Sequence, residues 1–373
     1  MPGGIALGYE FHATGVVGFQ GVLEELGEDL SSAKSYLGTH GDFGFTGEGI
    51  LNTFSSAHED ALGRVNSQID HLHEYFTSTL HQHMGEVLGL YHVQEDGAEE
   101  KLRELERTFK ADSDRLVRDR DSGATTTEPD TGFPRPAEPG DRLTTPSPDA
   151  DDVYIQPEPN NVLDHFSVQF VARQMIVMFT DHDDPMDWLG KRFAGDWEAF
   201  LACADALDNV ASCIRDVADN FIAHVDQLEA AWSGNAYDAF NLALRNIRDQ
   251  IVDGTVVPIE DLAKNYRDAA SSTVQDYLAI EPIMGTVVDA IGTMGFGLVK
   301  NTFKLKDFIK EAVEPSLDQA VDIAAGSLAA AETKKVDFTE VELVELREIG
   351  GSGSGLMLND DGLPVVVEQY EQL

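Results

Sequence analysis

Basic side chains are scarce in this chain of 373 residues, which carries 26 lysines and arginines against 67 aspartates and glutamates. The resulting formal charge of −41 repels the phosphate backbones of DNA and RNA. The densest group of lysines, between Lys300 and Lys310, is diluted by Asp307 within it and Glu311 next to it, so no local basic patch offsets this repulsion. We therefore expect no nucleic-acid partner and an acidic, self-repelling surface.

Cysteine is nearly absent, and histidine is missing from the last third of the chain. Cys203 and Cys213 stand ten residues apart in one predicted helix. That is about 15 Å along the axis, too far for a disulfide within the helix, and the redox state of both stays open. No histidine follows His224, so the C-terminal third cannot by itself hold a Ser-His-Asp triad or a Cys-His pair. We predict no catalytic residues, no enzyme activity and no cofactor.

Ordinary export and membrane signals are lacking too. Residues 1–19 contain no basic region and no compact apolar run that ends at a cleavage site, so we expect no conventional signal peptide. The most apolar later segment, Ile283 to Val299, is about 17 residues long and contains Asp289 and four glycines. This is short for a membrane span. We expect it to pack as a glycine-rich helix, with membrane contact through it as the lesser alternative.

Metal ligands do not converge in the sequence. His71, His73, His81 and His83 spread around a helix at about 100° per residue and never share one face. The acidic segment 180–185 lacks the acid spacing and the central glycine of a calcium loop. We therefore predict no metal site.

Proline is concentrated in one place, since eight of the 14 prolines fall between Pro129 and Pro159. Proline removes backbone donors, and the acidic residues around it repel one another. Residues 121–160 are therefore predicted to form an extended linker rather than a packed element. This linker separates an N-terminal half, residues 1–120, from a second half, residues 161–300, and a C-terminal part at 301–373 follows.

The second half carries apolar residues at unbroken steps of three and four, which predicts one long helix with a narrow apolar seam. The seam consists of Trp197, Phe200, Ala204, Leu207, Ala211, Ile214, Ala218, Phe221, Val225, Leu228 and Trp232. We predict that Gly234 ends this helix and that Asn235 caps the next one. The next helix runs through Phe240, Leu244, Ile247 and Ile251, kinks between Asp253 and Pro258, and continues through Ile259, Leu262, Tyr266 and Ala269.

The first half has the same plan. Its first arm carries Phe19, Leu23, Leu26, Leu30, Ala33 and Leu37, and its second carries Leu51, Phe54, Ala61, Val65, Ile69, Leu72, Phe76, Leu80, Val87 and Leu90. In the glycine-rich tip between them, Phe45-Thr46-Gly47 holds the place of Trp232-Ser233-Gly234. We interpret the chain as a divergent duplication of a helical hairpin, in which each narrow seam requires a partner seam.

The C-terminal part is predicted to contain an amphipathic helix from Phe303 to about Lys334. After the glycine-rich residues 350–355, a β-hairpin is predicted around Asp361-Gly362. The predicted fold is therefore all-α, with two long antiparallel helical hairpins of the four-helix-bundle type, a proline-rich linker and a short C-terminal β-hairpin tail.

A tyrosine followed four residues later by an acid closes the second arm of each predicted hairpin. The pairs are Tyr91 with Glu95 and Tyr277 with Glu281. The pattern alone is weak, because a third copy lies by chance in the linker. Its weight comes from the corresponding positions of the two pairs.

A long helix, a Trp-x-Gly tip, a second helix and a Tyr-x-x-x-acid tail resemble the WXG family, the helical-hairpin substrates of type VII secretion in actinobacteria and their relatives. The resemblance is strongest from Trp197 to Glu281 and weaker from Phe19 to Glu95, where phenylalanine replaces the tip tryptophan. In that family two hairpins pair as a four-helix bundle and are exported without a conventional signal peptide. The tip of one hairpin and the tail of its partner together form the export signal.

The resemblance assigns recognition roles by position. The residues are Trp232, Gly234, Tyr277 and Glu281, then Tyr91 and Glu95, with Phe45 and Gly47 at the weaker tip. It also implies the secretion ATPase as a partner, together with either a small WXG-type hairpin protein or pairing of the two hairpins within the chain.

We therefore predict a non-enzymatic substrate or effector of type VII secretion, made in the cytoplasm and then secreted or held at the cell surface. Two alternatives stay open. One is a secreted polymorphic toxin with an enzymatic or membrane-active C-terminal part, and the other is a cytoplasmic helical scaffold.

Overall fold

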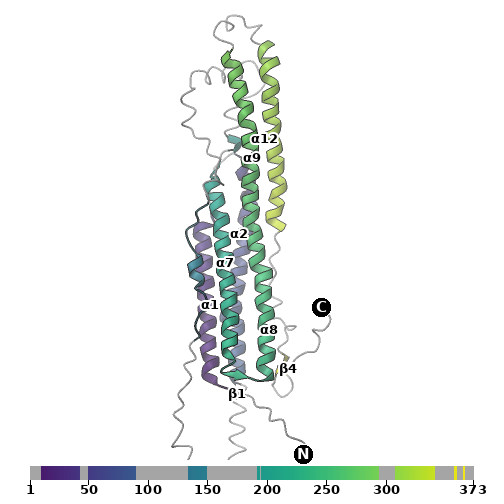
Figure 1. Cartoon of the computed structure of the whole chain (residues 1–373). Coiled ribbons are helices and arrows are strands. Elements are labelled where there is room, and N and C mark those ends of the chain that lie inside the picture. The colour runs from purple at the N-terminus through teal and green to yellow at the C-terminus, as the bar shows by residue number, and fades with distance from the viewer. Residues whose placement is uncertain are drawn as a thin grey trace, which may run out of the picture.

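Long α-helices make up most of the computed structural model, so the predicted all-α class is confirmed. The structure describes residues 10–42, 49–89, 133–148, 191–193, 195–293, 307–340, 357–358 and 364–365. The long helices run side by side along one axis, which gives this part of the molecule an elongated shape (Figure 1).

The first two long helices follow the seams predicted for the first half. Helix α1 spans Ala13–His40, and after a 3-10 turn at Ile50–Phe54 helix α2 spans Ser55–Glu74. A π-helical turn at Tyr75–Leu80 continues α2, and residues 81–89 are again helical. The apolar seam of α1 faces α2 and α7, where its large side chains are fully buried.

Helix α7 spans Trp197–Leu228 and begins where the seam predicts. Asp196 caps it, because its carboxylate accepts a hydrogen bond from the Ala199 N–H at 2.9 Å.

The prediction that α7 continues to Gly234 is wrong. After Leu228 the chain turns, and Trp232–Ser233 form the two-residue strand β2, which pairs antiparallel with β1 at Glu10–Phe11. The His12 N–H also donates to the Ala231 carbonyl at 2.6 Å. These partners from the far end of the chain satisfy backbone groups that a longer helix would have paired internally.

The second arm begins with α8, Asn235–Ile251, whose N-cap is Gly234 rather than the predicted Asn235. A π-helical turn at Val252–Val256 leads into α9, Val257–Thr293. The predicted kink is therefore a π turn, which inserts an extra residue without breaking the helix. Its Thr255 is buried and accepts a hydrogen bond from Gln68 Nε2 of α2 at 2.9 Å.

The prediction that Tyr277 closes this arm is wrong, because α9 runs sixteen residues further, through Pro282. The cause is packing. Ile280, Met284 and Val287 continue the apolar spacing and are buried, and α9 packs along α12. Burial of such side chains, at about 25 cal/mol per Å², outweighs the single hydrogen bond that a proline removes.

The C-terminal helix ends six residues later than the predicted Lys334. After a π turn at Ile309–Val313, α12 spans Glu314–Glu340 and lies beside α9, so that both extend beyond the ends of α1 and α7 (Figure 1). Near its end Phe338 packs on Phe54 and Tyr266, with ring centroids 5.3 and 4.6 Å apart respectively. Two short strands, β3 at Met357–Leu358 and β4 at Pro364–Val365, pair antiparallel.

Helices α1 and α7 pack along their lengths in opposite directions. The start of α1 adjoins β1, which pairs with β2 just beyond the end of α7. Near the end of α1, the Tyr36 hydroxyl accepts a hydrogen bond at 2.8 Å from Asn209 Nδ2, in the first half of α7. The cores of the two sequence halves are therefore continuous.

The prediction that the linker does not pack is wrong for residues 133–148, which we call the strap. The strap lies along α1 and α7 and contains a 3-10 turn, Pro139–Arg142, whose Pro139 is buried. Proline content indicates only that a segment cannot form a helix or a central strand. It does not prevent an extended segment from packing where side chains satisfy its backbone. The rest of 121–160 lies outside the described residues.

Candidate functional site

The tip of the second half is built around a buried tryptophan. Trp232 is 1% exposed, and its ring lies 6.1 Å from Phe11, 6.1 Å from Tyr237 and 5.1 Å from Phe240 between centroids. The side chain thus joins the N-terminal strand to the start of α8. In this state the indole is part of the core, and Glu229 and Ala230 of the same tip are exposed.

Gly234 gives the tip its shape. Its φ of 104° lies in the region that favours glycine, and the residue is half-buried. This conformation reverses the chain between β2 and α8. Three residues on, the Tyr237 hydroxyl donates a hydrogen bond at 2.8 Å to the Val225 carbonyl, which ties α8 back to α7.

Tyr277 and Glu281 lie far from this tip. Tyr277 is 43 residues beyond Gly234, which along the helical arm corresponds to roughly 65 Å. Its half-buried ring packs edge-to-face on Phe193, with centroids 5.7 Å apart. The structure therefore does not bring the Trp232 tip together with the Tyr277 pair.

The other four predicted recognition residues, Phe45, Gly47, Tyr91 and Glu95, lie outside the described residues. Their neighbours in sequence are placed, however. Residues 81–89 lie at the Trp232 end, because the His81 carbonyl accepts a hydrogen bond from Gln20 Nε2 at 3.0 Å near the start of α1.

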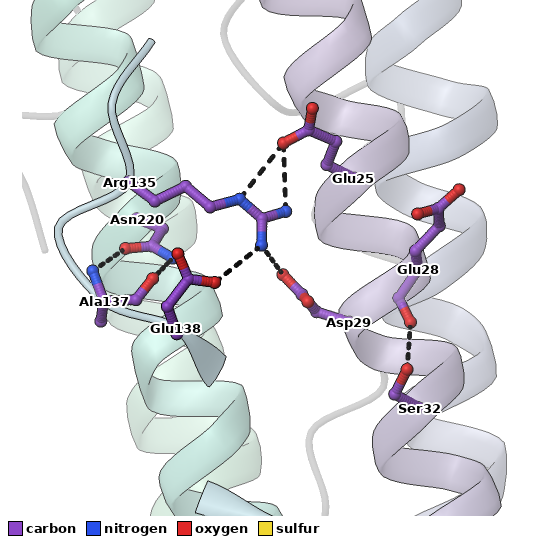
Figure 2. A network of polar contacts seen from close by, with 8 residues as sticks. All are labelled: Glu25, Glu28, Asp29, Ser32, Arg135, Ala137, Glu138 and Asn220. Atoms are coloured by element: carbon purple, nitrogen blue, oxygen red, sulfur yellow. Dashed lines mark hydrogen bonds and ion pairs between the residues drawn. The ribbon is translucent and has the colours of Figure 1, made fainter. Parts of the chain in front are cut away.

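The strap is held by a polar site that the sequence reasoning missed. Asn220 of α7 is fully buried, and its amide forms hydrogen bonds with both backbone groups of Ala137. Its Oδ1 accepts from the Ala137 N–H at 3.0 Å, and its Nδ2 donates to the Ala137 carbonyl at 2.9 Å (Figure 2). A side-chain amide that satisfies both backbone groups of one residue holds an extended segment whatever its side chain is.

Arg135 of the strap faces α1 (Figure 2). Its guanidinium lies 3.1 Å from Glu25 Oε2, 3.3 Å from Asp29 Oδ2 and 3.7 Å from Glu138 Oε2. Burial raises the pKa of the Asp29 carboxyl, and the charge of Arg135 opposes that rise. The strap therefore supplies the cation that a partly buried acid on α1 requires.

The two ends of the strap make further contacts. The Phe133 ring lies 6.3 Å from Phe19 and 6.0 Å from His224 between centroids. At the other end the Thr144 carbonyl accepts hydrogen bonds from Asn209 Nδ2 at 3.1 Å and from the Tyr36 hydroxyl. Both α1 and α7 contribute at each end, so the strap bridges the two helices.

A signal for this site was present in the sequence. A second row of residues at steps of three and four runs along α7 beside the apolar seam. It consists of Asn209, Cys213, Asp216, Asn220, His224 and Gln227. Such a mostly polar row on a helix, buried at Asn220 and His224, indicates that another segment covers it.

A buried polar pair links the two halves at another level. His58 Nδ1 of α2 lies 2.6 Å from the Tyr266 hydroxyl of α9, and both side chains are almost completely buried. Burial lowers the pKa of His58 to about 4 and raises that of the nearby thiol of Cys203 to about 12. A thiol with so high a pKa carries almost no thiolate near neutral pH, so it is a poor nucleophile.

The described residues form neither a metal centre nor a membrane-spanning helix. No three histidine, cysteine, aspartate or glutamate side chains in these segments gather closely enough to hold a metal ion. Among the described helices, none is long and apolar enough to cross a membrane.

Comparison with known proteins adds no assignment. The chain matches no protein-family model, no curated protein and no solved structure with which it was compared.

Proposed function

We propose that the protein is a non-enzymatic substrate or effector of a type VII secretion system, exported as a folded bundle of two helical hairpins. The first hairpin consists of α1 and α2, and the second of α7 with α8 and α9. The two-residue pair β3–β4 is the short β-hairpin tail of this arrangement. In the WXG family that the sequence resembles, the two hairpins of the bundle come from two proteins, whereas here one chain supplies both.

The observation that carries this proposal is the antiparallel packing of α1 on α7. Around this packing, Phe19 of α1 lies 6.4 Å from Phe240 of α8 at one end, and Phe54, just before α2, lies 5.7 Å from Phe200 of α7 at the other. The two hairpins thus bury their seams against each other over the length that α1 and α7 share, and α12 covers α9 beyond it. Exposing these seams would be unfavourable by about 25 cal/mol per Å², which supports pairing within the chain.

The positions of the helix ends favour one combination of residues for the export signal. Antiparallel pairing puts the end of the first hairpin beside the tip of the second, where residues 81–89 lie. Tyr91 follows two positions later in the sequence. We therefore propose that the signal combines the Trp232-to-Gly234 tip with Tyr91 and Glu95. The role of the buried indole would be to hold the tip in shape.

Export can be tested in an actinobacterial host with an intact type VII system and in a matched strain that lacks its ATPase. We expect the protein in the culture filtrate or at the surface of the first strain only. Tyr91→Ala should reduce export strongly, whereas Tyr154→Ala, at the chance copy of the motif, should not. Equal export from both strains, or none from either, would refute the proposal.

Pairing within the chain has its own test. A protease site placed between residues 121 and 132 of the full chain would cut it once. We expect the two pieces to stay together on size-exclusion chromatography. If they separate and each melts at the same temperature as before, the hairpins do not form one bundle and the family's two-protein arrangement applies instead.

A further inference from the structure

We propose that the face between α1 and α7 is a binding site for extended peptides that carry an aromatic residue, prolines and arginine. Residues 133–148 fill it in cis, and a partner segment of the same chemistry takes it in trans. This inference does not depend on type VII secretion. It rests on how the strap is held.

The backbone of the strap is bound by amide side chains at three separate places. Asn220 holds both backbone groups of Ala137, Gln227 Nε2 donates to the Pro134 carbonyl at 3.3 Å, and Asn209 Nδ2 donates to the Thr144 carbonyl. All three lie in the polar row of α7. Bonds from side chains to a peptide backbone are typical of sites that bind extended ligands, because such ligands have no internal hydrogen bonds.

Side-chain contacts add selectivity. Phe133 fits against Phe19, and Pro139 is buried at the 3-10 turn. Two arginines then meet acids of the two helices, Arg135 at Asp29 and Arg142 Nε at Asp216 Oδ2, 2.6 Å away. In a chain with 26 basic against 67 acidic residues, arginine at both positions is a specific feature. The ligand pattern is therefore aromatic-Pro-Arg, a buried proline four residues on, and a second arginine.

The strap belongs to the same chain as the face that it fills, so it competes with any outside peptide as an intramolecular ligand. At one end Phe133 lies beside Gly18 of α1, and at the other the Thr144 carbonyl accepts from Asn209 Nδ2 of α7. At an effective concentration on the order of 1 mM, a strap with an intrinsic Kd of about 10 µM would weaken binding of an outside peptide about 100-fold.

The experiment uses the full chain and a fluorescein-labelled synthetic peptide of residues 131–148, with binding measured by fluorescence anisotropy. In a release variant, Phe133→Ala, Arg135→Ala and Arg142→Ala weaken the strap and leave α1 and α7 unchanged. We expect the peptide to bind the release variant at least 30-fold more tightly than the wild type. Adding Asn220→Ala should reduce binding about tenfold, and a peptide with the same three alanines should not bind.

A second version of the experiment uses the wild-type chain, so that it does not depend on folding of the release variant. Protease sites on both sides of the strap cut it free from the folded wild-type chain. We expect the cut strap to dissociate on dilution and to be displaced by excess labelled peptide, with the helical circular dichroism unchanged. Any one of four results would overturn the proposal. They are loss of helix when the strap leaves, a strap that never exchanges, equal binding of the altered peptide, and a wild-type dimer in which straps are swapped between copies.

Discussion

Replacing His58 by asparagine should remove a defined part of the pH dependence of folding. His58 is 1% exposed and Tyr266 is 0% exposed, and their contact joins α2 to α9 across the two halves. Burial lowers the pKa of His58 from 6.5 to about 4 in the folded protein. In the unfolded chain the imidazole titrates near its ordinary value of about 6.5.

The sign and size follow from proton linkage. Below about pH 6.5 the unfolded chain binds a proton at His58, whereas the folded protein does not bind it until the pH falls to about 4. Lower pH therefore favours unfolding. The contribution of His58 to stability is therefore intact above pH 6.5 and is lost progressively as the pH falls to about 4. Between pH 7 and pH 5 the loss should be about 2 kcal/mol.

The assay is urea unfolding of the wild type and of His58→Asn at pH 7 and pH 5, followed by circular dichroism. Asparagine keeps a hydrogen-bonding group near the Tyr266 hydroxyl but does not titrate. The excess stability of the wild type over the variant should shrink by about 2 kcal/mol at the lower pH. Comparing the two proteins cancels the shared response of the carboxylates.

A second variant strengthens the test. Tyr266→Phe removes the hydrogen bond but leaves His58 buried, so its pH dependence should resemble that of the wild type. The free energies of unfolding of the wild type and of His58→Asn differ by an amount that should change with pH. If this difference changes by less than about 0.5 kcal/mol between the two pH values, His58 is not held buried in its neutral form and the packing of α2 on α9 is wrong.

Three other substitutions test the packing by denaturant unfolding. Trp232→Ala should cost about 3–5 kcal/mol, since it empties a core position between β1 and α8, and a loss below about 1 kcal/mol would contradict that packing. Gly27→Ala should lower the free energy of unfolding, because the added Cβ would lie 2.3 Å from the Thr77 methyl. In a Thr77→Ser background, which lacks that methyl, the same Gly27→Ala change should instead raise the free energy of unfolding by up to about 1 kcal/mol. Gly234→Ala should cost about 1–3 kcal/mol at its φ of 104°, whereas Gly38→Ala in α1, with open space at its Cβ, should stabilise; equal effects would refute the strained tip.

The helices could be predicted from the sequence because their apolar spacing is local. The start of α7 at Trp197 and the buried seams of α1 and α2 follow from residues within one helix. The end of α7 could not be predicted, because the strand that competes for Trp232 begins at Glu10, at the opposite end of the chain. Local patterns carry no information on such partners.

The packed strap and the extent of α9 were missed for the same reason. Proline and acid content describe what residues 133–148 cannot form, while Asn220 and Asp29 determine where they bind. Pro282 is a helix breaker in isolation, but α12 covers the apolar residues around it. The recognition residues were assigned by resemblance, and among them only Trp232, Gly234 and Tyr277 have surroundings that the structure describes.

The antiparallel packing of α1 on α7 has a consequence for the protein during its synthesis. The ribosome completes α1 and α2 well before it reaches the end of α7 at Leu228. At a synthesis rate of roughly 5–20 residues per second, the interval between the completion of α2 and the completion of α7 is on the order of 10–30 s. During that interval a nascent chain exposes the side chains that will later face α7. The first two helices therefore reach their final packing partner only after α7 has left the ribosome.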